Sequence, residues 1–316
     1  MNRFTNPHTH NLKRRLWNFL LWKAGYYHDE KSLPKVPDQF HYPFSPLLLQ
    51  EKEPKVMWIG HSTFLVEYSG VGILTDPIWS EYCSPIPFFG PRRLIPTPIS
   101  IDELPQIDFV LISHNHYDHL DRKTVIALIR RFPTIQWVIP IGVKKWFKKI
   151  GIENTYELSW WKEISLQNEK NHLTITATPT QHFSGRGLFD GNTSLWNGYV
   201  VKMDGKTLYF AGDTGYNPHD FKEIGKKWGG FDLSLIPIGT YSPKEFMQPV
   251  HIGPEEAVLI HKEVQSKFSI GMHWKTFHLS DEPLQLPPYH LYLAMQKAHL
   301  PHKDFIPLDP GLYINW

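Results

Sequence analysis

Cysteine is nearly absent from this chain of 316 residues, and neither sign of charge is in excess. The one cysteine, Cys83, excludes a disulfide bond within the chain and a metal site built on several thiolates. Lysine and arginine number 33 against 31 aspartates and glutamates, so the formal net charge is only +2. Proteins that hold nucleic acid by bulk charge show a strong basic excess, and we therefore expect no nucleic-acid partner.

Long apolar runs are also missing. No stretch approaches the roughly 18–20 apolar residues that a membrane-spanning helix requires. The apolar run at residues 16–22, which contains Asn18 and follows three basic residues, is short for the core of a signal peptide. We therefore expect a cytoplasmic protein, or one that lies peripherally on a membrane surface.

Histidine, proline and aromatic residues are abundant instead. The chain holds 18 histidines, and its 27 prolines exceed the usual share of ~5%. Its 12 tryptophans, 14 tyrosines and 19 phenylalanines are enough to fill a large core. This composition indicates a folded, loop-rich protein in which imidazole groups have a chemical task.

Residues 1–54 are predicted to form an irregular N-terminal arm, because closely spaced prolines such as Pro34, Pro37 and Pro43 prevent long helices. The exception is a short basic and aromatic helix predicted at residues 11–22. Two interpretations stay open for this helix: it packs against the core, or it lies in a membrane interface with its basic residues at the headgroups.

From residue 55 to residue 316, strands and helices alternate, which predicts one α/β domain. Apolar and β-branched runs predict strands at residues 56–59, 63–68, 72–76, 107–113, 137–140, 173–178, 199–203, 207–211, 233–238 and 268–272. Amphipathic segments predict helices at residues 121–132, 143–150, 219–228, 254–264 and 288–298.

The segment with the most chemical content is the loop expected between the strand at 107–113 and the helix at 121–132. It carries four potential metal ligands within six residues: His114, His116, Asp118 and His119. Because both ends of the loop are fixed, these side chains can converge, and imidazole with carboxylate suits Zn²⁺ and similar ions. With ligands added from elsewhere, the set exceeds one tetrahedral site and predicts two metals.

Three other predicted strands end in a further potential ligand. His182 follows the strand at 173–178, Asp213 follows the strand at 207–211, and His273 follows the strand at 268–272. A single histidine or aspartate at a strand end is more often structural. Together with the histidine-rich loop, however, these three predict one composite metal site.

These motifs resemble the metallo-β-lactamase superfamily, and within it the N-acyl-phosphatidylethanolamine phospholipase D-like group. The resemblance implies a four-layer αββα sandwich, with residues 55–316 as the catalytic domain and residues 1–54 as an arm on the core or a membrane. The matching segments are residues 3–7, 60–63, 74–77, 90–91, 111–121, 160–161, 211–216, 236–239, 254–257 and 273–274.

The resemblance also implies two zinc ions with protein ligands only from histidine and aspartate, which leaves Cys83 a structural role. The first ion would be held by His114, His116 and His182, the second by Asp118, His119 and His273, with Asp213 bridging both. Asp118, Asp213 and His251 are the implied catalytic residues.

The implied reaction is that of a phospholipase D: hydroxide held by the metals attacks phosphorus and splits N-acyl-phosphatidylethanolamine into N-acylethanolamine and phosphatidic acid. Two other functions stay open, namely hydrolysis of another ester, lactone or phosphodiester, and metal binding without catalysis. A phospholipid or small ester substrate, peripheral membrane contact and a homodimer are the expected partners.

The implied substrate contacts are Tyr117 and His251, with His251 also able to protonate the leaving group. Val250 stands where members of the group can carry a polar residue, which puts the headgroup contact in question. His61 and Asp76 lie in matching segments and are either structural or orient the ligand histidines.

Aromatic residues outside the metal motif allow two interpretations. Phe88 and Phe89, together with Trp17, Phe19 and Trp22 of the arm, form either an apolar mouth for a lipid or ordinary core. The neighbouring Arg92 and Arg93 either face anionic headgroups or form a solvated surface pair.

Overall fold

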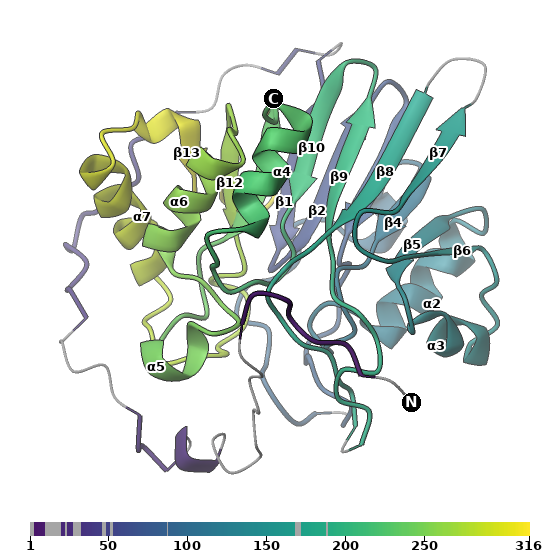
Figure 1. Ribbon diagram of the computed structural model, residues 1–316, viewed down its shortest axis with the longest axis horizontal. Helices are drawn as coiled ribbons and strands as arrows, with labels where there is room; N and C mark the ends of the chain where they lie inside the picture. The colour runs from purple at the N-terminus through teal and green to yellow at the C-terminus, as the bar shows by residue number, and fades with distance from the viewer. Residues whose placement is uncertain are drawn as a thin grey trace.

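The computed structural model describes residues 3–9, 20–22, 24–27, 33–45, 49–50, 53–86, 88–167, 172–187 and 189–316. Within these residues two mixed sheets of seven strands each lie face to face, and helices cover both outer faces (Figure 1). Side chains from both sheets, including Trp58, Tyr199 and Phe210, form a continuous core between them. The α/β sandwich predicted from the sequence is therefore confirmed.

The first sheet has the strand order β14-β1-β2-β3-β4-β5-β6. Pairing is antiparallel from β14 to β3 and parallel from β3 to β6. Its strands are β1 (Lys55–Gly60), β2 (Thr63–Tyr68), β3 (Val71–Thr75), β4 (Phe109–Leu111), β5 (Gln136–Pro140), β6 (Thr155–Leu158) and β14 (Tyr313–Asn315).

The second sheet has the order β13-β12-β11-β10-β9-β8-β7. Pairing is antiparallel from β7 to β10 and parallel from β10 to β13. Its strands are β7 (Glu163–Gln167), β8 (His172–Thr178), β9 (Gly198–Met203), β10 (Lys206–Phe210), β11 (Leu233–Pro237), β12 (Ser269–Met272) and β13 (Phe305–Ile306).

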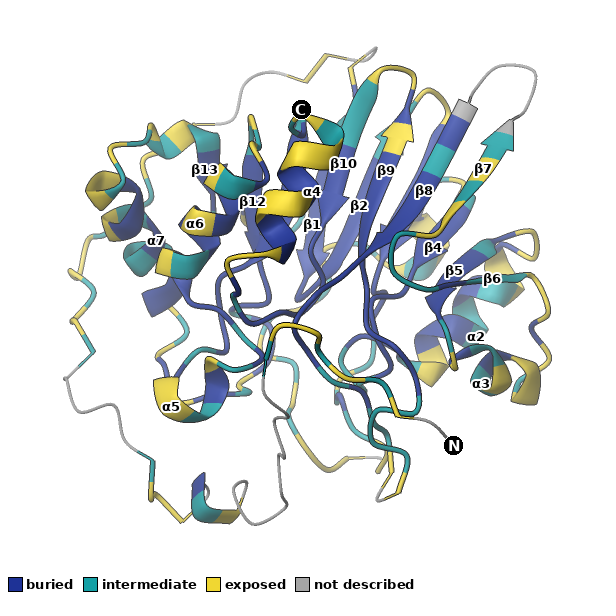
Figure 2. Ribbon diagram, in the orientation of Figure 1, coloured by how far each residue is buried: buried dark blue, intermediate teal, exposed yellow. Residues whose placement is uncertain are grey.

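Helices α2 and α3 pack on the first sheet, whereas α4, α6 and α7 pack on the second (Figure 1). Each helix turns buried side chains to its sheet and exposed ones outward, as α4 shows clearly in Figure 2. The helices are α2 (Arg122–Arg131), α3 (Lys144–Lys149), α4 (Asp220–Trp228), the short α5 (Lys244–Met247), α6 (Pro254–Glu263) and α7 (Leu286–Lys297), with 3₁₀ turns at Ile101–Glu103 and His302–Asp304.

The buried strands of the two sheets determine where the polar loops lie. β3, β4, β11 and β12 are buried at every residue, as expected for strands covered on both faces. Histidine and charged side chains are absent from these four strands and follow them at their carboxyl ends, where loops from both sheets meet. Helix α2 fixes one such loop, because the Asp121 side chain accepts hydrogen bonds from the backbone N–H groups of Lys123 and Thr124.

The structure differs from the predicted elements in a few places. The strand expected at 107–113 ends at Leu111, because the Ser113 N–H donates to the Asp76 carboxylate at 2.6 Å instead of continuing a ladder. Helix α7 begins at Leu286, two residues before the predicted start at Pro288. Five elements were not predicted from the sequence: the short α5 and the four outermost strands of the two described sheets, β6, β7, β13 and β14.

The described parts of the N-terminal arm pack on the domain. Trp22 is only 8% exposed, stacks on Phe246 of α5 with ring centroids 5.2 Å apart, and donates to the Asp281 carboxylate at 2.8 Å. Trp22 thus contacts the core, as one of the two interpretations proposed. Most of the helix predicted at 11–22, including Trp17 and Phe19, lies outside the described residues.

None of the helices that the structure describes is long and apolar enough to cross a bilayer.

A buried histidine on α6 predicts that acid destabilises the fold. The His261 Nδ1 atom hydrogen-bonds the Ser269 hydroxyl at 2.8 Å, and burial lowers the pKa of His261 to about 4. The unfolded chain takes up this proton near pH ~6.5, so the stability that neutral His261 contributes is complete above that pH and is lost as the pH falls toward 4. We expect this histidine alone to remove about 2 kcal/mol between pH 7 and pH 5.

The measurement is urea unfolding of wild type and His261→Gln at both pH values, with His278→Gln, an exposed histidine, as the control. The His261 variant should lose less stability between pH 7 and pH 5 than wild type. An identical loss in the two proteins would contradict the prediction.

Candidate metal centre

Seven side chains that the sequence singled out converge where the carboxyl ends of strands from both sheets meet. The histidine-rich loop follows β4 of the first sheet, whereas the other ligands follow β8, β10 and β12 of the second. β8, β10 and β12 run in the same direction, so their carboxyl ends lie at one edge of the second sheet. The residues brought together are His114, His116, Asp118, His119, His182, Asp213 and His273.

Three imidazoles form the first half of the site. His116 Nδ1 lies 2.8 Å from His114 Nε2 and 3.3 Å from His182 Nε2. All three ligand atoms lie within 4.8 Å of one another. Nitrogen lone pairs gathered this closely suit a cation such as Zn²⁺, which imidazole binds readily.

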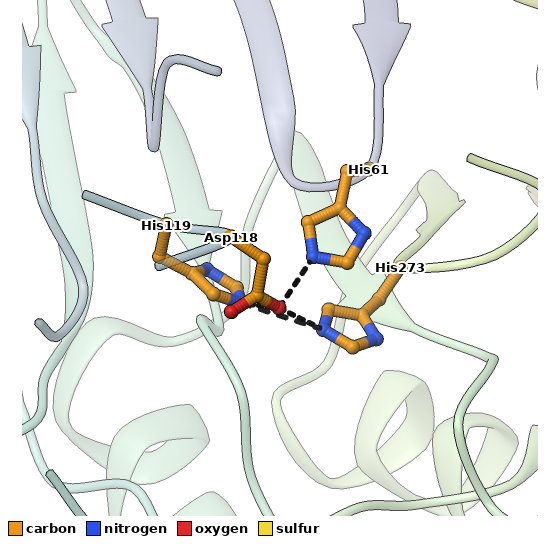
Figure 3. Close-up of side chains that lie close together, drawn as sticks. All are labelled: His61, Asp118, His119 and His273. Atoms are coloured by element: carbon orange, nitrogen blue, oxygen red, sulfur yellow. Dashed lines mark hydrogen bonds and ion pairs between the residues drawn. The ribbon is translucent and has the colours of Figure 1, made fainter. Parts of the chain in front are cut away.

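One carboxylate and two imidazoles form the second half, shown in Figure 3. Asp118 Oδ2 lies 3.3 Å from His119 Nε2 and 3.6 Å from His273 Nε2, and these two nitrogens are 3.4 Å apart. His61 approaches the same carboxylate oxygen, with its Nε2 at 2.9 Å. His61 therefore contacts the carboxylate among the proposed ligands, whereas the sequence analysis left it either structural or orienting a ligand histidine.

Asp213 connects the halves. Its Oδ2 atom lies 3.0 Å from His273 Nε2, 3.2 Å from His119 Nε2 and 3.8 Å from His182 Nε2. Its Oδ1 atom is buried, and no hydrogen-bond donor reaches it from the described part of the chain. A buried carboxylate oxygen without a donor is costly unless a cation lies beside it.

The outer ring nitrogens of four ligand histidines are held by the protein, which leaves Nε2 facing the site. Because each partner offers an oxygen that can accept a hydrogen bond, we assign the ring proton to Nδ1 in each case. The pairs are His114 with Ser113 Oγ at 2.9 Å, His119 with Asp76 Oδ2 at 2.7 Å, His182 with the Val250 carbonyl at 2.9 Å, and His273 with Thr240 Oγ1 at 3.0 Å.

Asp76 and Thr240 are fixed in turn. Asp76 is buried, which raises the pKa of its carboxyl group, and it accepts hydrogen bonds from Ser113 as well as from His119. The Thr240 N–H donates to Glu282, a buried carboxylate that the sequence analysis did not single out. Asp76, Thr240 and His273 have φ angles of 33°, 68° and 64°, in the left-handed region that is strained for such residues.

The charges of the site favour a cation. Burial raises the pKa values of Asp118 and Asp213, but the neighbouring histidines outweigh it and hold both well below the usual range. Burial lowers the pKa of His273, but the nearby carboxylates outweigh it and raise that pKa to about 9. With five imidazoles, two carboxylates and one buried acceptor without a donor, the residues present fit divalent metal ions.

The N-terminal segment also reaches this site. The Asn6 side chain donates to the backbone carbonyl of His182 at 2.9 Å and accepts from the Trp196 indole at 3.0 Å. The Phe4 N–H donates to the Asn192 carbonyl at 2.9 Å, and the segment crosses the loops below β8 and β9 in Figure 1. Residues 3–7 matched the family in sequence, but their position beside a ligand was not predicted.

We expect Asn6→Ala to weaken metal binding by about tenfold, because the contacts that orient ligands typically contribute that much. The measurement is a calorimetric titration of Zn²⁺ into metal-free protein. Thr5→Ala, at an exposed neighbouring position, is the control. Equal affinities of the two variants would show that Asn6 does not position His182.

Arg186 holds the histidine-rich loop, although the sequence analysis did not select it. Its Nη1 atom donates to the carbonyls of Asn115 and Leu120, each at 2.8 Å, and so spans three of the ligands, His116, Asp118 and His119. Its guanidinium lies 3.9 Å from the ring centre of Tyr117, whose hydroxyl donates to the Arg186 carbonyl at 2.9 Å. The Tyr117 hydroxyl is thus engaged in a contact within the protein, while Tyr117 itself lies between the ligands His116 and Asp118 along the chain.

The other residues singled out from the sequence differ in how far they are buried and in what they contact. His251 Nδ1 is 3.8 Å from Asp213 Oδ2, so His251 stands at the edge of the ligand cluster. Phe88 and Phe89 are 85% and 69% exposed and do not belong to the core. Arg93 donates to the Ile78 carbonyl at 2.6 Å within the protein, whereas the exposed Arg92 pairs with Glu81.

Comparisons with known proteins bear on the family of the chain. The family model for the beta-lactamase superfamily domain matches residues 72–274. N-acyl-phosphatidylethanolamine-hydrolyzing phospholipase D 1 of Caenorhabditis elegans is 41% identical over 261 residues, which are 80% of this chain and 73% of that protein. The mitochondrial N-acyl-phosphatidylethanolamine-hydrolyzing phospholipase D of Saccharomyces cerevisiae is 36% identical over 264 residues, 80% of this chain but only 55% of that protein.

A solved structure shares the fold. Igni18, a metallo hydrolase from the archaeon Ignicoccus hospitalis, superposes with a TM-score of 0.61 at 22% identity. The match covers 83% of this chain and 98% of that one.

Proposed function

Since the chain belongs to the metallo-β-lactamase superfamily, in its N-acyl-phosphatidylethanolamine phospholipase D-like group, we propose that it is a binuclear-zinc phosphodiesterase of phospholipase D type. Membership of this family makes it a metal-dependent hydrolase. The proposed substrate is N-acyl-phosphatidylethanolamine, whose hydrolysis would yield N-acylethanolamine and phosphatidic acid. The observation that carries the proposal is Asp213, which lies between two clusters of imidazoles with one buried oxygen that no described donor reaches.

Two metal ions are proposed at the centre. His114, His116 and His182 would hold one, and Asp118, His119 and His273 the other, with Asp213 shared. Divalent ions bound there would supply Lewis acidity, which activates water and offsets the negative charge that develops on the phosphoryl oxygens. Asp118 would accept a hydrogen bond from the attacking water and so orient it toward phosphorus.

His251 is proposed to donate a proton to the leaving oxygen. It lies at the edge of the cluster, 3.8 Å from Asp213, and its side chain is 11% exposed, so it can meet a substrate. We expect His251→Ala to slow release of an alkoxide by about 10²-fold, the usual contribution of general acid catalysis. Release of p-nitrophenolate, which needs no proton, should change little.

The measurement compares kcat for an N-acylated phospholipid and for bis(p-nitrophenyl) phosphate, with metal content determined in both proteins. Equal losses on the two substrates would contradict proton donation by His251.

A lipid substrate requires contact with a bilayer or micelle, and the proposed contact lies near the metal centre. Phe88, Phe89 and Phe189 are 85%, 69% and 87% exposed. The segments that carry these residues are connected to the loops of the centre. Arg93, a few residues after Phe89, forms a β-bridge with Phe277, four residues after His273, and Arg186, three residues before Phe189, donates to the histidine-rich loop. Peripheral membrane association through these aromatic residues is part of the proposal, and the homodimer stays a prediction.

The test of function uses the zinc-loaded protein and N-acyl-phosphatidylethanolamine in mixed micelles. Mass spectrometry should detect N-acylethanolamine and phosphatidic acid, and in heavy-oxygen water the label should enter phosphatidic acid, because attack is at phosphorus. Turnover of lactones or other esters without turnover of this lipid would favour the alternative hydrolase. Zinc binding with no turnover of any of them would favour a non-catalytic metal protein.

A further inference from the structure

A cavity of about 790 Å³ lies between α5, α6 and α7, next to the metal centre. His251 lines this cavity and at the same time approaches Asp213 to 3.8 Å. His251 therefore separates the cavity from the metal ligands. A group that leaves phosphorus on the His251 side would enter this space.

Part of the cavity wall is apolar. Leu33 of the arm, Pro254 of α6, and Leu293 and Ala294 of α7 line it. The described parts of the N-terminal arm contact two of the helices around the cavity, α5 and α7. Trp22 stacks on Phe246 of α5, and Phe40 contacts Tyr289 and Tyr292 of α7 with ring centroids 4.9 and 5.4 Å apart.

The polar groups of the cavity do not favour an anion. Its lining contains three glutamates against two lysines. Both lysines face carboxylates, since Lys297 lies 3.1 Å from Glu255 and Lys244 lies 4.0 Å from Glu256. Uncharged hydrogen-bonding groups are present as well, because the Tyr241 hydroxyl and His290, 2.8 Å apart, also line the space.

From these features we propose that the cavity binds the N-acylethanolamine arm of the substrate, the part that leaves, with its amide near Tyr241 and His290 and its acyl chain against Leu293. This assignment rests on the proposed function. The N-acylethanolamine part of the substrate is uncharged and carries one acyl chain, and pockets of ~300–1,000 Å³ typically enclose one ligand of that size. The glycerol arm carries two chains and would lie outside the cavity, on the side of the exposed phenylalanines.

The test fills the cavity and varies each arm of the substrate separately. Leu293 is 36% exposed, so Leu293→Trp can fold normally while its indole occupies the space. The matched control is Leu259→Trp on α6, at a residue that is 43% exposed and does not line the cavity. Both variants and wild type are assayed on substrates with short and long N-acyl chains, and with short and long glycerol-bound chains.

We expect Leu293→Trp to lower kcat/KM for long N-acyl chains by about tenfold, as mismatched apolar pockets do. Its activity on short N-acyl chains and on bis(p-nitrophenyl) phosphate should stay within about twofold of wild type, and Leu259→Trp should resemble wild type throughout. Unchanged selectivity for the N-acyl chain, or a change that follows the glycerol-bound chains instead, would overturn the assignment.

A binding measurement separates this inference from the proposed function. Calorimetry with a long-chain N-acylethanolamine and the zinc-loaded protein should give saturable binding to wild type and about tenfold weaker binding to Leu293→Trp. Absence of lipid hydrolysis by wild type, with this binding intact, would defeat the proposed function but leave the cavity assignment standing. Equal binding by both proteins, or none by wild type, would defeat the cavity assignment alone.

Discussion

Asp213→Asn is expected to lower kcat/KM by about 10³-fold and to weaken the binding of both metal ions. The carboxylate is buried and lies within 3.2 Å of a nitrogen from each of His119 and His273. An amide keeps the shape but removes the negative charge that balances these groups. Losing one partner of a buried charge pair costs about 3–5 kcal/mol, and about 1.4 kcal/mol corresponds to each tenfold change.

The measurement is kcat/KM on N-acyl-phosphatidylethanolamine and on bis(p-nitrophenyl) phosphate, together with metal content by mass spectrometry. Asp220→Asn is the matched control, because Asp220 is also a buried aspartate but pairs with Asn217 and His8, away from the metal ligands. That variant should keep its metals. An Asp213→Asn protein that retained two metals and wild-type turnover would refute the proposed centre.

Removing the metals by dialysis against a chelator is expected to abolish hydrolysis, and two equivalents of Zn²⁺ should restore it. Binding should also depend strongly on pH. The pKa of His273 lies at about 9 and that of His119 well above its usual value, in both cases because the nearby carboxylates outweigh burial. Near pH 7 both imidazoles hold a proton that an incoming metal must displace.

Acid should therefore weaken metal binding, and a higher pH should strengthen it. Since protons compete with the metal below pH ~9, the apparent affinity should rise as the pH rises from 6 to 9, and metal should be lost on acidification. Calorimetric titrations in buffers of different ionisation enthalpy count the protons released, and about two per chain are expected near pH 7. Full activity after chelation, or an affinity independent of pH, would contradict this account.

The sequence predicted the metal ligands because of where they lie along the chain. His114, His116, Asp118 and His119 share one loop, and a dense cluster of that kind has few structural explanations. The distant ligands were found because each follows an apolar run that became a buried strand. The family resemblance then grouped them, and the structure brings the same residues within a few ångströms of one another.

The contacts around the ligands carry no comparable signal. The Val250 carbonyl orients His182, but every residue has a carbonyl, so this role leaves no mark on the sequence. Asn6 and Glu282 act on residues 176 and 42 positions away, and such distances cannot be inferred from local spacing. Arg186 resembles any other basic loop residue until its two carbonyl partners are known.

The strands that the sequence analysis missed share one physical cause. β6, β7, β13 and β14 are the outermost strands of the described sheets, so each pairs on one side only. Outermost strands are short and tolerate polar side chains, as the sequence Glu-Ile-Ser-Leu-Gln of β7 shows. The fully buried strands β3, β4, β11 and β12 were predicted, whereas β13, also fully buried, has only two residues and is too short to give a pattern.

The bond between Asn6 and His182 has a consequence for how the protein is made. Asn6 leaves the ribosome 176 residues before its partner does. At about 5–20 residues per second, roughly ten seconds or more pass while the N-terminal segment has nowhere to bind. The contact that holds His182 therefore forms only after residue 182 has been made, and the full set of ligands exists only once His273 has followed.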